Sequence, residues 1–137
     1  MKKCTLILNA KQDRNHCLVM NDSGEIVSES YKIVTPVVPK QGWLEYDSEK
    51  LWQSMYGAAI EALILGSVNV KDIIRLYVNN DSRTVVAWSA GTGKPVCNAI
   101  HEKCIRTDEY YKKLLKKGVQ GEIERKTGLS VTSVCLH

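Results

Sequence analysis

Short apolar runs alternate with polar turns over the first part of the chain. The apolar segments cover residues 5–8, 17–20 and 25–34, and residues 21–24 read Asn-Asp-Ser-Gly between the second and the third. Apolar runs of this length, bounded by turn-forming residues, are typical of β-strands joined by tight connections. We therefore expect an antiparallel meander of three strands.

A period of about four residues begins after a loop at residues 36–42 that contains two prolines. Apolar pairs recur at positions 51/52, 55/56, 59/60 and 63/64. Asp47 stands where an N-cap belongs and Gly66 where a C-cap belongs. The pattern predicts one long helix with a wide buried face.

The stretch that follows this helix, residues 72–79, is almost continuously apolar. Runs of this kind are typical of strands that are buried on both faces. Because the run comes directly after a long helix, the pattern predicts a β-α-β crossover that ends in a parallel strand.

A glycine-rich segment separates two further apolar stretches, at residues 84–88 and 95–100, and this arrangement predicts a hairpin. Residues 91–94 read Gly-Thr-Gly-Lys and resemble the end of a phosphate-binding P-loop. That motif requires glycine at position 88 and Ser or Thr at position 95, where the chain has Trp88 and Pro95. We interpret the segment as a hairpin loop.

The last part of the chain has a helical pattern. Two short helices are expected at residues 107–117 and 120–126, the second closed by Gly128, and an apolar run at residues 129–136 fits one more strand. The basic run at residues 112–117 keeps its leucines at helical spacing and has no aromatic stacking platform. We therefore expect a solvated helix face there and no nucleic-acid partner.

The composition is that of a soluble globular protein, with 44% hydrophobic and 25% charged residues and a net charge of +4. No apolar run approaches the roughly 18 residues that span a bilayer, and the apolar stretch near the start is too short for a signal peptide. We expect one domain over residues 1–137, no membrane association and a cytoplasmic location.

The cysteines support a reducing compartment. They are odd in number and form no C-x-x-C pair: Cys4, Cys17, Cys97, Cys104 and Cys135. Cys97, His101 and Cys104 have the spacing of zinc ligands on a helix, and Cys135 or His137 could supply a fourth. The strand expected around Cys97 breaks that spacing, so we expect no metal site.

Several segments resemble the glycerol kinases of the FGGY carbohydrate-kinase family. Residues 42–47, Gly-Trp-Leu-Glu-Tyr-Asp, and Leu-Trp at 51–52 are similar to a G-W-V-E-x-D segment followed by I-W. Further similar segments follow in the same order: Asn80 with 84–88, then 92–95, 98–100, Cys104 with Arg106 and Thr107, and 126–129. The resemblance runs without a gap from about Cys4 to Leu136.

The resemblance implies an α/β, ribonuclease H-like fold of the actin-like ATPase type. The expected unit is a half-domain with a mixed sheet, the three-stranded meander, one long crossover helix, a parallel strand, a hairpin and two short helices. Family members are much longer, and these 137 residues contain neither the second domain, which binds the adenosine part of ATP, nor the segment with the catalytic aspartate. Phosphoryl transfer by these residues alone therefore lacks its base and its closing cleft.

The positions that match the family's phosphate loop, D-x-G-T-T-S-x-R, carry other residue types. They are Asn9, Lys11, Gln12, Asp13, Arg14 and His16. Asn9 lacks the negative charge that favours Mg²⁺ or its waters, and Asp13 repels a phosphate. Lys11 and Arg14 add positive charges that the family's loop lacks at these positions. Residual binding of ATP therefore remains an alternative. We expect no ATP or Mg²⁺ cofactor.

The resemblance also places the family's glycerol-binding arginine, glutamate and tyrosine at Ser82, Arg83 and Val134. Each lost hydrogen bond to a small polyol typically costs ~1–3 kcal/mol. A shift of one residue would align Arg83 with the arginine but would break the match at residues 84–88. We expect the glycerol site to be absent.

These replacements favour a catalytically incompetent, glycerol-kinase-like chain with no catalytic residues that acts by protein–protein binding or self-association. The expected partner is another copy of this chain or a full-length glycerol kinase, because a half-domain exposes strand edges and apolar surface. The alternative is an ATP-dependent phosphotransferase, or a nucleotide- or polyol-binding subunit, that needs a complementing chain. A third reading is a reconstructed or engineered piece without a natural role.

Overall fold

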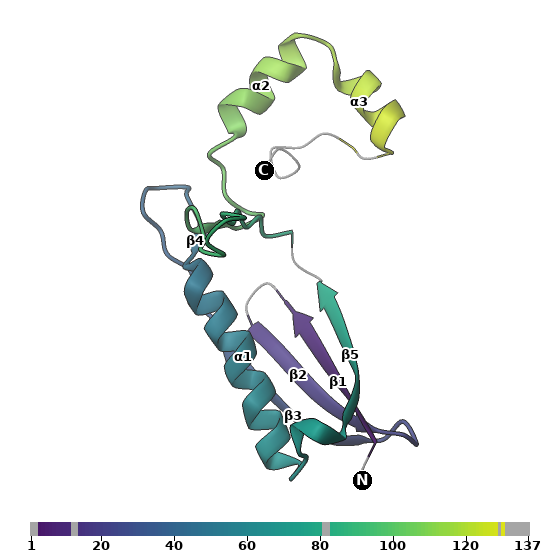
Figure 1. Ribbon diagram of the computed structural model, residues 1–137. Helices are drawn as coiled ribbons and strands as arrows, with labels where there is room; N and C mark the ends of the chain where they lie inside the picture. Colours follow the sequence, from purple (N-terminus) through teal and green to yellow (C-terminus); the bar gives the residue numbers. More distant parts are fainter. Residues whose placement is uncertain (1–2, 12–13, 81–82, 129, 131–137) are drawn as a thin grey trace.

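A four-stranded mixed sheet with one long helix against it forms the body of the protein (Figure 1). The computed structural model describes residues 3–11, 14–80, 83–128 and 130. The strands are β1 (Cys4–Ala10), β2 (Arg14–Asn21), β3 (Ile26–Ile33) and β5 (Ile73–Asn80), in the order β3-β2-β1-β5. β2 pairs antiparallel with both β1 and β3, so the predicted meander is confirmed.

Helix α1 (Ser48–Leu65) begins and ends where the sequence predicts. The Asp47 side chain accepts hydrogen bonds from the backbone N–H groups of Glu49 and Lys50, and Gly66 is the C-cap. Asn15 ties the helix to β2, because its amide donates to the Leu51 carbonyl at 3.0 Å. These contacts fix the helix against the meander.

The main core lies between α1 and the sheet. Its buried members are Cys4, Cys17, Val19, Ala58, Ala62, Leu63 and Val68. Alternate residues of each strand face the helix, as the two-residue period of a strand requires. Burial raises the pKa of the Cys17 thiol to about 11, so this residue behaves as a small apolar side chain.

The crossover is also confirmed. The chain passes from β3 through α1 and a 3₁₀ turn, η1 (Val70–Asp72), into β5, which runs parallel to β1. Asn69 caps the turn by accepting from the Lys71 N–H at 3.0 Å. In the register of this pairing, Leu6 lies beside Leu76 and Leu8 beside Val78.

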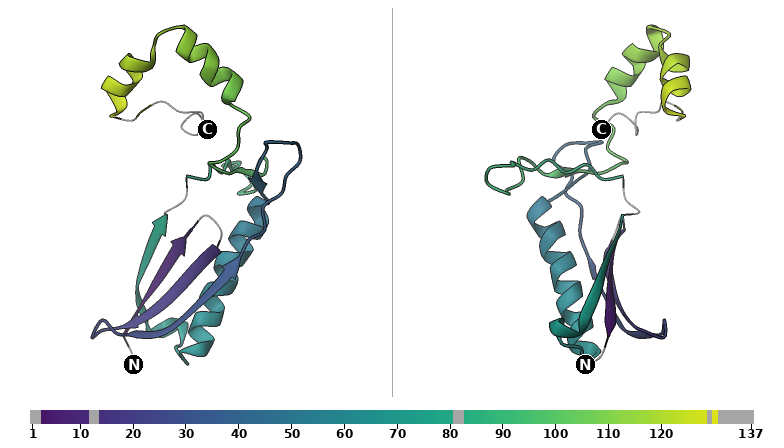
Figure 2. Two further views of the ribbon diagram at one scale, coloured as in Figure 1. Left: turned by 180° about the vertical axis from the view of Figure 1, so that it is seen from behind. Right: turned by 45° about the vertical axis from the view of Figure 1, so that its right-hand side comes forward.

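The wide buried face predicted for α1 is wrong. Only one side of the helix is buried, through small residues such as Ala58 and Ala62. Trp52, Tyr56 and Ile64 are 61%, 59% and 70% exposed. The reason is that the helix packs mainly on β2 and β3, and the right-hand view of Figure 2 shows it on one side of the sheet.

The predicted burial of the parallel strand is wrong as well. Leu76 and Val78 are 58% and 69% exposed, although their neighbours on β1 are partly buried. α1 contacts β2 and β3 far more than it contacts β1, and its main contacts do not include β5. Among the described residues, β5 is therefore an edge strand with little cover.

A second, smaller sheet joins β4 (Glu45–Tyr46) to β6 (Ala99–Ile100). The predicted hairpin is present, but it is held by isolated bridges at Val85–Ile100 and Trp88–Pro95 and has little regular strand. Pro95 has no N–H to donate, which explains part of this irregularity. Val34, Tyr46 and Ala99 form a small core beneath it.

Two short helices complete the described part, α2 (Asp108–Lys116) and α3 (Gln120–Thr127), and both were predicted. Gly128 closes α3 at a φ of +70°, a conformation that favours glycine. The final predicted strand, residues 129–136, lies outside the described residues except for Ser130. In the described ranges, no helix combines the length and apolar character needed to cross a membrane.

Candidate functional site

Two neutral amides meet where β1 and β5 end. Asn9 and Asn79 are neighbours in the parallel register, and Asn79 Nδ2 donates to Asn9 Oδ1 at 3.3 Å. Parallel strands end at the same edge of a sheet, which is where ligands usually bind in open α/β sheets. This edge therefore presents amide groups and no carboxylate at these two positions.

Two of the other described phosphate-loop positions, Arg14 and His16, contact β3. The Lys11 N–H donates to the Arg14 carbonyl at 3.0 Å and closes the turn between β1 and β2. The Arg14 guanidinium lies 5.8 Å from the centre of the Tyr31 ring, and His16 Nε2 lies 3.0 Å from Glu29 Oε2. Gln12 and Asp13 lie outside the described residues.

A wide depression of about 730 Å³ contains Lys11, Arg14 and His16 together with acidic residues. Glu29 faces His16, and Glu61 pairs with Lys32 at 2.7 Å. Hydrogen bonds from Lys32 and then Ser30 lower the pKa of Glu61, so this carboxyl holds its negative charge. Carboxylates among the cations make the surface a poor match for a phosphate.

The predicted glycerol-site positions are only partly described. Arg83 follows β5 and has an exposed side chain, while Ser82 and Val134 lie outside the described residues. A cavity of about 260 Å³ lies beside this segment, between the ends of β1 and β5 and the first turns of α1. Its walls are mainly apolar, with Trp52 and Trp88 among them and Lys11 and Asn80 at the strand ends.

A polar network is centred on Glu45, a buried residue of β4. Asn98 Nδ2 donates to Glu45 Oε2 at 2.8 Å, and Arg106 Nη2 donates to Glu45 Oε1. These hydrogen bonds, first from Asn98 and then from Arg106, hold the pKa of Glu45 below its usual range. The Arg106 guanidinium also lies 4.1 Å from the centre of the Trp43 ring.

The same arginine contacts a cysteine, since Arg106 Nε donates to Cys104 Sγ at 3.0 Å. Burial alone would raise the pKa of the Cys104 thiol. Hydrogen bonds from the Arg106 and Leu44 backbone and from the Arg106 side chain outweigh that effect, so the pKa is lowered. Burial lowers the pKa of His101, whose Nδ1 accepts from the Lys103 N–H at 2.9 Å.

The structure gives each of the proposed zinc ligands a separate environment. Cys97 is exposed, Cys104 is paired with Arg106, and His101 accepts from a backbone N–H. Within the described ranges, no three His, Cys, Asp or Glu residues gather as a metal site would require. Cys135 and His137 lie outside those ranges.

The motif residues kept in this chain therefore hold the framework together. Two stretches far apart in the sequence, one with Trp43 and Glu45 and the other with Asn98, Cys104 and Arg106, meet in one network. The sequence reasoning missed this network because it took the segments one at a time. The only available signal was that each segment kept its polar residue.

Comparison with known proteins identifies the family. Residues 13–135 match the profile of the FGGY family of carbohydrate kinases, N-terminal domain. The chain is 37% identical to a glycerol kinase of Clostridium botulinum and 35% identical to glycerol kinase 2 of Clostridium tetani, each over 129 residues. Both alignments cover 94% of this chain and 26% of the relative, so the chain spans about a quarter of their length.

Solved structures show the same fold. Plasmodium falciparum glycerol kinase, crystallised with ADP, has a TM-score of 0.83 at 20% identity, over 97% of this chain and 27% of that one. Lactobacillus acidophilus gluconate kinase has a TM-score of 0.83 at 14% identity, over 94% of this chain and 25% of that one. The predicted actin-like fold is thereby confirmed. The chain belongs to the FGGY family of carbohydrate kinases, as an N-terminal portion of a glycerol kinase-like protein.

Proposed function

We propose that this chain does not transfer phosphoryl groups by itself and acts by binding another protein chain. The observation that carries the proposal is the Asn9–Asn79 amide pair at the shared end of β1 and β5. Phosphoryl transfer depends on metal ions and fixed charges that neutralise the transferred group. A neutral amide at Asn9 supplies none of that charge, and the resemblance assigns an aspartate to this position.

Exposed apolar surface supports the binding half of the proposal. Trp52, Tyr56 and Ile64 form a stripe along α1, and Leu76 and Val78 are open on β5. Contiguous apolar surface of this kind usually marks a place where another chain binds. The partners that fit are a second copy of this chain and a full-length glycerol kinase.

The first part of the proposal, that the chain does not transfer phosphoryl groups by itself, is tested with the purified chain. We expect no glycerol-dependent phosphoryl transfer from ATP, and no heat when Mg²⁺·ATP or glycerol is titrated at micromolar concentration. Asn9→Asp is the informative variant. Its carboxylate still accepts from Asn79, so the fold is retained, and we expect activity to stay absent because Lys11 and His16 remain. Turnover or binding by the unaltered chain would contradict the proposal.

The second part of the proposal, that the chain binds another protein chain, is tested by size-exclusion chromatography with light scattering. The chain is measured alone and mixed with full-length glycerol kinase. We expect self-association or a complex with the kinase. A compact monomer that does not bind the kinase would contradict this part of the proposal. The described cysteines are free thiols, which supports a reducing, cytoplasmic compartment for the encounter.

A second candidate function is that of a phosphotransferase or polyol-binding subunit that becomes complete with another chain. The cavity beside Lys11 and Asn80 favours it, because it opens at the strand ends where ligands bind in such folds. Its mainly apolar walls, with Trp52 and Trp88, suit a polyol poorly. Mixing the chain with a kinase fragment that lacks this portion, and assaying for phosphoryl transfer, separates the two candidates.

A further inference from the structure

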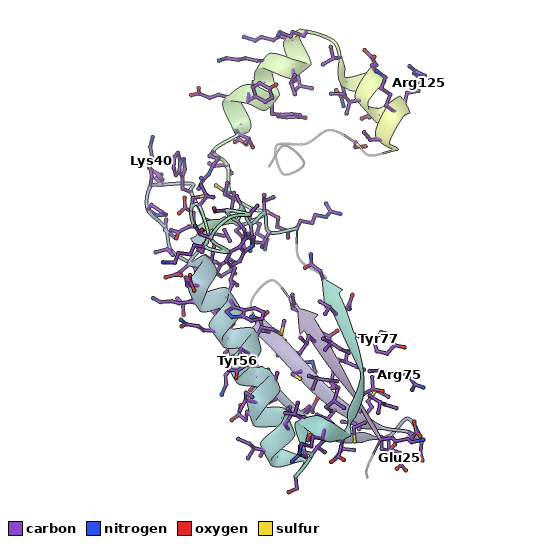
Figure 3. The ribbon with its side chains drawn as sticks, in the orientation of Figure 1. Glu25, Lys40, Tyr56, Arg75, Tyr77 and Arg125 are labelled. Atoms are coloured by element: carbon purple, nitrogen blue, oxygen red, sulfur yellow. The ribbon has the colours of Figure 1, made fainter. Side chains whose placement is uncertain are left out.

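We propose that His101 is a pH-sensitive latch. Its neutral imidazole closes the turn at residues 101–104, and protonation of the ring opens that turn while the main core stays folded. The inference goes beyond the proposed function and does not depend on it. The turn lies between β6 and α2, so the latch acts on the segment that joins the small sheet to α2. Figure 3 shows side chains crowded around the small sheet, where this segment begins.

Hydrogen bonds of the backbone and of the ring meet at His101. Its N–H donates to the Leu44 carbonyl at 3.0 Å, and its carbonyl accepts from the Cys104 N–H at 2.9 Å. Ring nitrogen Nδ1 accepts from the Lys103 N–H, also at 2.9 Å. The bond to Nδ1 requires a lone pair on that atom. A neutral ring with its proton on Nε2 supplies the lone pair, whereas a protonated ring has none.

The ring is enclosed as well as hydrogen-bonded. His101 is 4% exposed, and its ring centre lies 5.4 Å from that of Tyr46 on β4. A charge in such an enclosed position is costly. Protonation would therefore bury a charge and would also turn two N–H donors, those of Nδ1 and Lys103, towards each other. Opening the turn relieves both costs, because it exposes the ring and the Lys103 N–H to water.

The charged groups around the ring do not reverse this preference. Burial is the largest effect on the histidine and lowers its pKa, while Glu102 raises the pKa and Lys103 lowers it. On the neighbouring β4, Tyr46 presents its ring, and the Glu45 carboxylate accepts from Arg106. The neutral ring is therefore the form that the closed turn favours.

The direction of the pH dependence follows from the lowered pKa. Once the turn opens, the pKa of the histidine returns towards its ordinary value of about 6.5. The open form therefore takes up a proton at a higher pH than the closed form does. The stability of the closed turn is fully present above about pH 6.5 and is lost as pH falls from there through the lower pKa of the closed form. This range begins well above the ordinary pKa of carboxyl groups, about 4.

Amide hydrogen exchange of the full chain, followed by NMR at about pH 7.5 and about pH 5.5, tests the latch. We expect the protection of the Lys103 and Cys104 N–H groups, corrected for intrinsic exchange rates, to fall several-fold at the lower pH. The Cys17 N–H, in the main core, should keep its protection. An equal loss at Cys17 would show that the whole chain unfolds and would contradict a local opening. Unchanged protection at Lys103 would contradict the latch itself.

His101→Asn is the matched variant. The Asn oxygen accepts from the N–H two residues further on, as in an Asx turn, and it does not titrate. We expect the turn in His101→Asn to be equally protected at both pH values. A several-fold fall that persists in this variant would show that another group opens the turn.

His16→Gln is the control. It removes the other histidine of the described residues, and the new amide still donates to Glu29. We expect the fall in protection at Lys103 to be the same as in the unaltered chain. Loss of the pH response in His16→Gln would assign the effect to His16 and overturn the proposal.

The chemical shifts of the two ring nitrogens report the state of His101 directly and need no variant. At about pH 7.5 we expect a neutral ring that carries its proton on Nε2, and we expect the ring to titrate below about pH 6.5. A proton on Nδ1 at the higher pH, or titration at or above the ordinary pKa, would be incompatible with the latch.

Discussion

Arg106 and Glu45, which are 61 positions apart in the sequence, form an ion pair that is mostly withdrawn from solvent. The two side chains are 20% and 11% exposed. Asn98 and Cys104 accompany the pair, because Asn98 donates to the other oxygen of Glu45 and Cys104 accepts from Nε of Arg106. The pair fastens the segment that leads to α2 onto β4.

Removal of the cation should destabilise the protein strongly. Arg106→Ala leaves the Glu45 carboxylate without its charged partner, and breaking a buried pair in this way typically costs ~3–5 kcal/mol. We expect a loss near the lower end of that range in the free energy of unfolding measured with urea, since some exposure remains. Lys126→Ala is the control, because its pair with Glu122 is 64% and 57% exposed and should contribute less than ~1 kcal/mol. Equal losses of unfolding free energy in Arg106→Ala and Lys126→Ala would contradict a stabilising role for the Arg106–Glu45 pair.

The same carboxylate should make stability depend on pH. The pKa of Glu45 is lower in the folded protein than its usual value of about 4.3, so its contribution is fully present above that value. The contribution is lost as pH falls through the lower, folded pKa. We expect the free energy of unfolding to fall between about pH 5 and pH 3, and to fall less steeply in Glu45→Gln.

Some acid sensitivity should remain in that variant, because the pKa of Glu61 is also lowered, by hydrogen bonds from Lys32 and Ser30. Urea titrations at a series of pH values measure how steeply the free energy of unfolding falls with pH in the unaltered chain and in Glu45→Gln. Parallel curves for Glu45→Gln and the unaltered chain would show that Glu45 carries no such linkage.

Gly42 and Gly121 should respond to alanine with opposite signs. Gly42 has a φ of +79°, and a Cβ there would overlap the Ile105 side chain, so Gly42→Ala should lower the free energy of unfolding by ~1–3 kcal/mol. Gly121 lies in α3 with open space around its Cα, so Gly121→Ala should raise it by about 0.5–1 kcal/mol. Thermal unfolding of both variants gives the comparison, and a tolerated Gly42→Ala would contradict the close contact with Ile105.

The two sides of α1 should differ in their tolerance of substitution. Ala58 is fully buried against the sheet, and Ala58→Leu should destabilise by ~1–3 kcal/mol through overpacking. Ile64 is 70% exposed, and Ile64→Ala should change stability by less than about 0.5 kcal/mol. Urea unfolding at low protein concentration separates these effects from association. A large loss for Ile64→Ala under these conditions would contradict the exposure of this side chain in the monomer.

Local patterns accounted for most of the elements. The alternation of apolar runs and turns gave the meander, and Asp47 and Gly66 set the ends of α1, because these features act over a few residues. β4 was not predicted. It is only two residues long, and its pairing with Ala99 and Ile100 depends on the tertiary fold.

Burial was harder to predict than secondary structure. The apolar run of β5 indicated a strand buried on both faces, yet α1 lies over other strands. The apolar residues of a strand indicate that its surface favours burial. They do not indicate which other element covers that surface. The polar network was missed for a related reason, since Glu45, Asn98 and Arg106 come from three separate segments.

The parallel pairing of β1 with β5 also has a consequence for folding kinetics. Asn9 and Asn79 are 70 positions apart, whereas the meander pairs strands that follow each other along the chain. Closing a long loop costs more entropy than closing a hairpin, and such distant contacts slow folding. β5 should therefore join the sheet late. Substitutions in it should speed unfolding while leaving the refolding rate almost unchanged.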